Sequence, residues 1–245
     1  QHEMVLSAPI YARRAALISK IPNFWPLVLE QAPPEIDRYI QITDGELLLG
    51  ALNSLSVTRF EPDVDPRSVL IRFEFAENKY FEDKVLEKKF WWRTSLNKPW
   101  CGLVSEAVGI KWKSKEVDLT DGLLDLVLAA EKSISQNSST GATNGSGKKA
   151  GWTPEQKALH EKIQEKGISG LSFFTWFGYI GKRINAEESA QARSARREKP
   201  ATDASLNLEE DSDDEDEDDL EIFPDGGEVA TAFSEDLWPD AVKYF

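Results

Sequence analysis

Cysteine, histidine and methionine are all scarce in this chain of 245 residues, which holds one cysteine, two histidines and one methionine. The single thiol, Cys101, rules out an intramolecular disulfide and fits a reducing compartment. No apolar run reaches the roughly 18 residues that a membrane-spanning helix needs, and residues 1–7 lack the charged-then-apolar pattern of a signal peptide. We therefore expect a soluble protein of the nucleus or cytoplasm without a membrane partner.

Side chains that carry catalysis or hold metals are equally sparse. His2 lies near the start of the chain, His160 lies on a predicted polar helix, and Cys101 has no histidine near it in the sequence. The sequence has no glycine-rich phosphate loop and no metal-spaced cysteine or histidine cluster. Carboxylates that gather in one charge run do not form a tuned acid–base couple. These absences predict a protein that is not an enzyme and that binds no cofactor and no metal.

Acidic residues outnumber basic ones, and the formal net charge is −14. Residues 209–221 hold eleven carboxylates and no base, while the rest of the chain has 32 acidic and 29 basic residues. The acidity is therefore mostly one local feature, and a run this dense repels itself and stays solvated. It acts either as a solubilising segment or as an electrostatic attractor for a strongly basic partner.

Alternating apolar residues predict an antiparallel sheet. Residues 69–75 alternate apolar and polar side chains and give the cleanest strand pattern. Residues 55–61 are the expected hairpin partner, and residues 86–92 and 108–112 supply a third and a fourth alternation. The links between these segments are short, which favours antiparallel pairing.

Helical patterns precede the predicted sheet. Residues 4–30 carry apolar side chains at helical spacing, with Pro9 suited to a first turn and Pro22 to the end of the helix. Residues 43–54 form another expected helix, which Thr43 caps in a capping box with the glutamate three residues on.

The second half of the chain mixes polar and aromatic segments. Residues 133–151 are rich in serine, glycine and asparagine and predict a flexible linker. A polar helix follows, capped by Thr153 and stopped by Gly167. Two aromatic segments, 171–184 and 233–245, need a core to bury them. The whole pattern predicts an α+β fold with helices packed on one face of an antiparallel sheet.

A group of basic residues follows the first aromatic segment. Two bases, and then three of five residues after a gap of nine, have the spacing of a bipartite nuclear import signal. The alternative is a mobile linker with scattered bases. Phosphate contact needs denser cations, so nucleic acid is not the expected partner. The candidate import residues are Lys182, Arg183, Arg193, Arg196 and Arg197.

Six short stretches together resemble the SET branch of the nucleosome assembly protein family, most closely its fungal members, and they follow one another in the family's order. Each stretch alone is weak, whereas six in order are specific. They span most of residues 16–120 and 168–245. The stretches are ALISKIPNFW (16–25), SVTRFE (56–61), IRFEFAENKYFEDKVLEKKF (71–90), IKWKS (110–114) with DLT (118–120), SFFTWF (172–177) and EDLWPDAVKYF (235–245).

The resemblance implies an α+β earmuff domain, in which an antiparallel sheet packs on helices, attached to the end of a truncated dimerisation helix. Residues 1–21 would be that helix and residues 22–245 the earmuff domain, with a flexible linker at 133–151 and a mobile acidic insert at 185–230. A homodimer is expected when the full helix is present. The chain departs from the family in two respects. Most of the long dimerisation helix is missing, so a tight dimer is not expected of this chain. The acidic run precedes the final aromatic helix instead of following it.

The resemblance also implies a nuclear histone chaperone that binds core histones through acidic surfaces, H3–H4 first and H2A–H2B second, without a cofactor. A regulatory inhibitor or cofactor of a phosphatase or histone acetyltransferase is the alternative, with such enzymes as partners. Ser212, followed by three acids, is a candidate phosphorylation site. The candidate histone-binding residues are Glu187, Glu188, Glu209, Glu210, Asp211, Asp213, Asp214, Glu215, Asp216, Glu217, Asp218, Asp219, Glu221, Glu228, Glu235 and Asp236.

Overall fold

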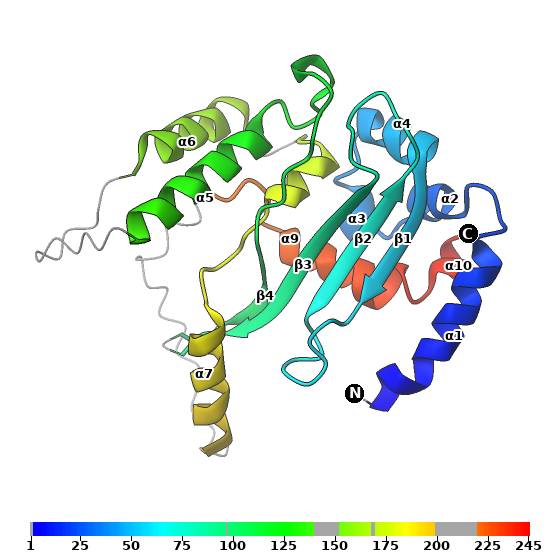
Figure 1. Ribbon diagram of the computed structural model, residues 1–245, viewed down its shortest axis with the longest axis horizontal. Coiled ribbons are helices and arrows are strands. Elements are labelled where there is room, and N and C mark those ends of the chain that lie inside the picture. Colours follow the sequence, from blue (N-terminus) through cyan, green and yellow to red (C-terminus); the bar gives the residue numbers. More distant parts are fainter. Residues whose placement is uncertain (1, 97, 140–151, 168–169, 199–219) are drawn as a thin grey trace, which may run out of the picture.

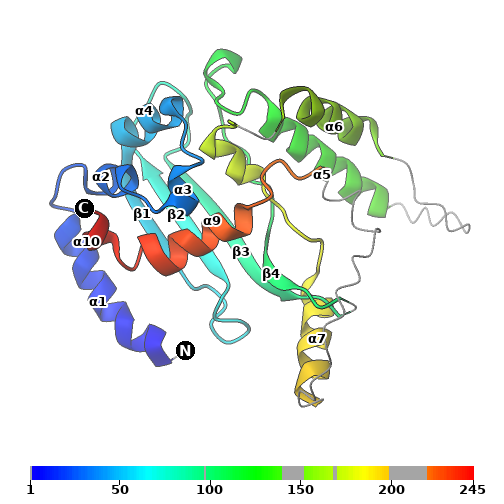
Figure 2. The same cartoon turned by 180° about the vertical axis from the view of Figure 1, so that it is seen from behind.

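The computed structural model describes residues 2–96, 98–139, 152–167, 170–198 and 220–245. One antiparallel sheet forms the first layer, and helices lie behind it (Figures 1 and 2). Helix α1 lies beyond β1 at one side, α5 and α6 lie together at the opposite side, and α7 projects from the lower end of the sheet. Within the described ranges, no helix is long and apolar enough to cross a membrane.

The sheet has the strand order β1-β2-β3-β4, and every neighbouring pair is antiparallel. This order is the simplest one that short connections allow, and it confirms the predicted antiparallel sheet. Its strands are β1 (Leu52–Thr58), β2 (Val69–Phe75), β3 (Val85–Thr94) and β4 (Cys101–Ser105).

The core lies between the sheet and the helices. In β2, every second residue from Val69 to Phe75 is buried, which confirms the predicted alternation. Phe73 sits at the centre of the core, and aromatic rings meet it mostly edge-on, the geometry that ring quadrupoles favour. The surrounding rings are those of Phe173, Trp176, Phe177 and Phe233, at centroid distances of 5.6–6.2 Å.

The helical layer comes from both ends of the chain. Helix α1 docks on the last segment, because Arg14 donates to the carbonyls of Trp238 and Pro239 at 2.6 and 2.8 Å. The elements of this layer are α1 (His2–Ile18), α2 (Phe24–Glu30), α3 (Pro34–Asp37), α4 (Ile42–Ala51), the 3-10 helix η2 (Phe173–Gly178), α9 (Gly226–Ala232), the π-helical turn η4 (Phe233–Leu237) and α10 (Ala241–Tyr244).

Helices α5 (Leu123–Ser139) and α6 (Pro154–Lys166) build a second, smaller apolar cluster with Ile222. The predicted start of α6 is confirmed. The amide of Gln156 donates to Thr153 Oγ1 at 3.2 Å, and the amide of Thr153 donates to the Gln156 side chain at 2.8 Å. The remaining described elements are the 3-10 turn η1 (Lys115–Val117) and α7 (Ala186–Glu198).

The fourth predicted strand, 108–112, is wrong. The fourth strand is β4, and residues 108–112 contribute only an isolated bridge between Trp112 and Phe81. The end of β4 and the segment after it bond instead to η2 and to residues 179–183, which we call the strap. The amide of Ser105 donates to the carbonyl of Ile180 in the strap, and the amide of Val108 donates to the carbonyl of Phe177 in η2. Its apolar alternation arises because the segment packs on the core, without a partner strand.

Two helix boundaries also differ from the predictions. Helix α4 begins at Ile42, and Gln41 and Asp44 form its capping box, so Thr43 is not the cap. Asp44 is fully buried and also accepts from the amide of Phe173 at 2.6 Å, a tertiary contact that fixes the helix start. Helix α1 begins at His2, which places Pro9 inside the helix and not in its first turn.

Helices and packed segments occupy parts of both the predicted linker and the predicted acidic insert. Helix α5 continues through Ser139, so residues 133–139 are helical, and 140–151 lie outside the described residues. In the insert, α7 occupies 186–198, and residues 220–230 pack on the core. In the insert the reason is burial of a few side chains within a polar sequence, among them Ser189, Ala192, Ile222 and Phe223, which a composition argument does not register.

Candidate acidic binding surface

Helix α9 and the turn η4 form one continuous amphipathic segment behind the sheet (Figure 2). One side packs into the core, where Phe233 is fully buried. The other side carries Glu228, Glu235 and Asp236. In η4 the amide of Trp238 donates to the carbonyl of Phe233 at 3.0 Å, a five-residue step. Such π turns occur frequently at functional sites.

These acids face a hollow of about 680 Å³ between α9–η4 and strand β4. Its volume lies in the range of ligand sites, roughly 300–1,000 Å³. The sheet side of the hollow consists of Trp92, Trp100 and residues 101–103, and Glu35 from α3 adds a fourth carboxylate. Sequence reasoning missed Glu35 and both tryptophans, because they lie more than a hundred residues from the acidic helix.

Tyr179 sets the distance between α9 and β4. Its hydroxyl donates to the carbonyl of Leu103 at 2.7 Å, and its ring lies so close to Gly226 that any Cβ there would overlap it. A Cβ at Gly227 would stand 3.2 Å from the same hydroxyl. The indole of Trp176 donates to the carbonyl of Gly226 at 2.9 Å. The glycine pair therefore lets α9 begin tightly against Tyr179, and this approach fixes the width of the hollow.

Two arginines at the rim partly neutralise the acids. Arg38 lies 3.5 Å from Glu228, and Arg59 lies 3.7 Å from Glu235. Both glutamates remain largely exposed, at 70% and 58% of the side chain. Exposed pairs of this kind contribute only about 0–1 kcal/mol. An incoming cation can therefore replace either arginine at little cost.

Two tyrosines donate hydrogen bonds to carboxylates around this surface. The pKa of Tyr244 is raised to about 12, first by its 2.7 Å hydrogen bond to Asp236, then by burial and nearby carboxylates. The pKa of Tyr39 is raised to about 12 by burial and by its hydrogen bond to Asp225. Both side chains therefore stay neutral hydrogen-bond donors to these carboxylates.

The sequence matches the family model of nucleosome assembly proteins over residues 11–245. The chain belongs to the nucleosome assembly protein family. A Schizosaccharomyces pombe relative named as a nucleosome assembly protein is 28% identical over 98% of this chain and 68% of its own length. Protein SET of Drosophila melanogaster is 38% identical over 44% of this chain and 39% of its own length. Human Protein SETSIP is 31% identical over 70% and 45%. The chain thus spans less than half the length of both SET relatives.

Solved structures confirm the earmuff fold of this nucleosome assembly protein family member. The crystal structure of Vps75 matches with a TM-score of 0.58 and 23% identity, covering 99% of this chain and 85% of that one. The crystal structure of Ccp1 matches with a TM-score of 0.56 and 23% identity, covering 99% and 82%. The predicted family, its SET-like relatives and the predicted fold class are therefore confirmed.

The structure brings three of the predicted acids, Glu228, Glu235 and Asp236, to one surface of the family domain. Two others lie elsewhere, on the first turn of α7. Glu187 is exposed there, while Glu188 accepts from the amide of Leu96 at 3.2 Å and so ties α7 to the β3–β4 loop. The acids of 209–219 and Ser212 lie outside the described residues.

Within the described part, no group of three or more His, Cys, Asp or Glu is arranged to hold a metal.

Glu221 has a different role from its neighbours in the acidic run. Its carboxylate accepts from the amides of Ile180, Gly181 and Phe223, each at 3.0 Å, and burial raises its pKa. These bonds occupy the carboxylate inside the fold, so we withdraw Glu221 from the histone-binding set. The change could not be read from the sequence, because Glu221 closes a run of identical charges.

Lys88 is a second buried charge that sequence reasoning did not single out. It is fully buried on the inner face of β3, and its Nζ donates to the carbonyls of Glu106, Phe177 and Tyr179 at 2.9–3.0 Å. Burial lowers its pKa to about 7, against the nearby charge of Glu221. The sequence did carry a signal of this burial, because Lys88 occupies an inward-facing position in the apolar alternation of β3. Together Lys88 and Glu221 hold the strap that supports Tyr179.

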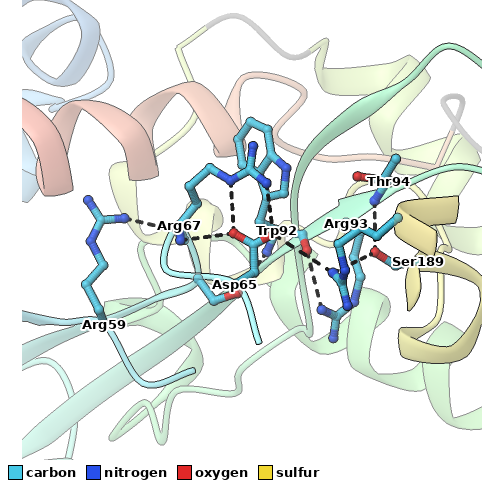
Figure 3. A network of polar contacts seen from close by, with 9 residues as sticks. Arg59, Asp65, Arg67, Trp92, Arg93, Thr94 and Ser189 are labelled. Atoms are coloured by element: carbon cyan, nitrogen blue, oxygen red, sulfur yellow. Dashed lines mark hydrogen bonds and ion pairs between the residues drawn. The ribbon is translucent and has the colours of Figure 1, made fainter. Parts of the chain in front are cut away.

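Asp65 anchors α7 to the lower end of the sheet (Figure 3). Arg67 donates two hydrogen bonds of 2.9 Å to its carboxylate, and Arg193 of α7 lies 3.9 Å away. Burial acts to raise the pKa of Asp65, but the arginines lower it overall. Ser189 of α7 also accepts from the amide of Thr94 at 3.1 Å. These contacts explain why α7 is a docked helix.

The predicted import residues lie in two different settings. Arg183 donates to the carboxylate of Glu131 at 3.2 Å and 2.5 Å, and Lys182 lies 5.9 Å from the ring of Trp100. Arg193 belongs to the Asp65 network, and Arg196 and Arg197 follow it along α7. The nuclear import signal stays a prediction.

Proposed function

We propose that this chain is a histone chaperone and that the acidic hollow between α9–η4 and β4 receives basic side chains of core histones, H3–H4 in preference to H2A–H2B. The four carboxylates that line the hollow are the observation that carries the proposal. Membership of the nucleosome assembly protein family supports it, and so does the description of Vps75 as a histone chaperone.

The charge pattern suits a reversible chaperone. Exposed carboxylates attract histone lysines and arginines through contacts that salt screens strongly. Arg38 and Arg59 already hold the glutamates in ion pairs that are easily exchanged. A histone cation therefore replaces an internal cation instead of meeting a bare charge, which keeps each contact weak and the complex reversible.

We assign separate tasks to the acidic run, taken without Glu221 as residues 209–219, and to the hollow. A dense polyanion raises the encounter rate and its dependence on salt. A shaped surface with fixed acids and aromatic rings orients the partner and slows its dissociation. Since a covalent tether keeps the run near the domain, it acts at a high effective concentration.

The first experiment removes the acids of the hollow. A variant with Glu228, Glu235 and Asp236 all changed to Gln is titrated with H3–H4 and with H2A–H2B. We expect about a tenfold or greater loss of H3–H4 affinity, since each lost pair contributes roughly 0.5–1 kcal/mol. The control changes three exposed acids on other faces, Glu77, Glu82 and Glu87, to Gln and so loses the same net charge. Equal losses in the two variants would refute the hollow as the site.

The second experiment replaces residues 209–219 with a neutral Gly/Ser linker of equal length and keeps Leu220 and Glu221, which pack and bond inside the fold. Stopped-flow mixing with H3–H4 should show a slower association and a shallower salt dependence, with a nearly unchanged dissociation rate. Unchanged association would remove the run from the mechanism. Complete loss of binding would contradict a separate contribution from the hollow.

We also propose that α1 takes part in a homodimer. Its Ile10 and Leu17 are 67% and 56% exposed. The 17 residues of α1 give about five helical turns, whereas a long coiled interface normally carries several heptads. Sedimentation should show a monomer or weak dimer, and a tight dimer when a longer helix precedes α1. A stable dimer of this chain at low micromolar concentration would contradict the proposal.

Nuclear localisation and phosphorylation complete the proposal. The bases Lys182, Arg183, Arg193, Arg196 and Arg197 would direct import. Phosphate on Ser212 would add about −1.5 to −2 charge to the run and strengthen its pull on histones. Labelling by an acid-directed kinase should disappear in Ser212→Ala, and equal labelling of both chains would dispose of the site.

A further inference from the structure

A second hollow of about 390 Å³ adjoins the acidic one. It lies between the α5–α6 pair and the strap after η2. Its lining is largely apolar, and it includes Val127, Ala130, Ile134 and Leu159. Three of these four side chains are buried, while Ile134 is partly exposed at the opening. The mechanism proposed above makes no use of this hollow.

The two hollows share a wall. Trp100, Tyr179 and Pro224 line both of them. The ring of Trp100 lies over Gly102, where an added Cβ would come within 2.8 Å of it. A polypeptide that lies in the acidic hollow therefore needs to extend only past the edge of this indole to reach the second one.

The charges of the second hollow do not favour another cation. Glu131 is paired with Arg183, and the carboxylate of Glu221 is occupied by three backbone amides. Lys182 lies at the same rim. A basic side chain would meet cations and engaged acids there, whereas an apolar side chain would meet an apolar lining.

We propose that the two hollows form one bipartite groove that reads a basic residue and, a few positions away, a bulky apolar side chain of the same partner. The inference rests on the proposed function, since it concerns the same basic partner. The acidic half supplies attraction that salt screens, and the apolar half supplies burial that salt does not weaken. The groove thus selects among basic polypeptides, which acidity alone does not.

The test uses pairs of synthetic peptides. Both members of a pair carry three consecutive arginines and a short Gly/Ser spacer, and they end in Phe or in Ala. The spacer varies across the series. Affinities are measured by fluorescence anisotropy at low and at high salt for the full chain, for Ile134→Gln, and for the control Ile42→Gln. Ile42 is 96% exposed on α4 and lies outside both hollows.

At the best spacer length we expect the Phe peptide to bind about tenfold more tightly than the Ala peptide, the effect of burying one large side chain. The ratio should persist at high salt, while both affinities fall. Ile134→Gln should reduce the ratio about fivefold and leave the Ala peptide unaffected. Ile42→Gln should change neither value. Thermal unfolding of Ile134→Gln within a few degrees of the parent confirms that the fold is intact.

Each contrary result has a distinct meaning. Equal binding of Phe and Ala peptides at every spacer length overturns the bipartite groove and leaves the acidic surface standing. Failure of both peptides to bind overturns the proposed function as well. A dimer whose dissociation constant changes with Ile134→Gln would assign the apolar hollow to a second copy of the chain and would also overturn the proposal.

Discussion

Two pairs of acids in this protein are alike in the sequence and opposite in the structure. Asp44 and Glu221 are held by backbone amides inside the fold, and burial raises the pKa of both. Glu228 and Glu235 lie on the surface of α9–η4 and pair with exchangeable arginines. The first pair stabilises the chain conformation, and the second is available to a partner. Charge alone therefore does not assign a role, whereas the donors around each carboxylate do.

The same contrast holds for neighbouring lysines on β3. Lys88 points into the core and Lys89 points to solvent. Lys88→Met leaves three carbonyls without a donor in a buried setting, so we expect a loss of about 3–5 kcal/mol in the free energy of unfolding. Lys89→Met should change it by less than about 0.5 kcal/mol. Urea denaturation of both variants measures the difference. Equal effects would mean that Lys88 is not a structural charge.

The pH dependence sharpens this point. Burial lowers the pKa of Lys88 from 10.5 to about 7 in the folded chain. Between these values the unfolded chain binds more protons than the folded one, so stability rises as pH rises. The stability difference between the parent and Lys88→Met should therefore grow by about 3 kcal/mol from pH 7 to pH 10. A constant difference in urea titrations at each pH would show that the three carbonyls keep the ammonium charged.

Matched substitutions test the contrast between the structural acid Glu221 and the surface acid Glu235. Glu221→Gln replaces one acceptor oxygen with a donor facing backbone amides, and we expect a loss of about 1–3 kcal/mol in stability. Its affinity for histones should stay within about twofold. Glu235→Gln should leave stability within about 0.5 kcal/mol and weaken histone binding by about twofold to fivefold. Parallel unfolding and binding titrations decide, and the reverse pattern would invalidate the assignment of Glu221.

The smallest expected effect on stability and binding concerns Arg59, which pairs with Glu235 at the rim of the acidic hollow. Arg59→Gln removes the ion pair with Glu235 and the 3.1 Å hydrogen bond to the carbonyl of Arg67. Stability should fall by less than about 1 kcal/mol, because the glutamate of the pair is 58% exposed and the ion pair is long, at 3.7 Å. Binding of an arginine peptide should tighten by about twofold, since Glu235 no longer has an internal partner. Weaker binding would show that Arg59 orders the surface instead of competing for it.

Local patterns predicted several elements well. The alternation of 69–75 identified β2, and Thr153 with Gln156 identified the start of α6, because both signals come from neighbouring residues. Residues 108–112 were wrongly predicted as a strand for the same reason. An apolar alternation indicates which side chains are buried, but it does not show whether a neighbouring strand or the core covers them. At α4, the cap depended on Asp44, whose position is fixed by a contact with Phe173 far along the chain.

The sequence by itself determined the periodicities of the strands, the caps of α6, the concentration of acid in 209–221 and the family. Those features depend on residues close together in the chain or on their order. Only the tertiary structure decided which acids are available to a partner and what stands opposite them. Glu35, Trp92, Trp100 and the α9–η4 acids meet because Gly226 and Gly227 allow α9 to approach Tyr179. Burial and hydrogen-bond donors, which depend on packing between distant segments, then separate a structural carboxylate such as Glu221 from a binding carboxylate such as Glu235.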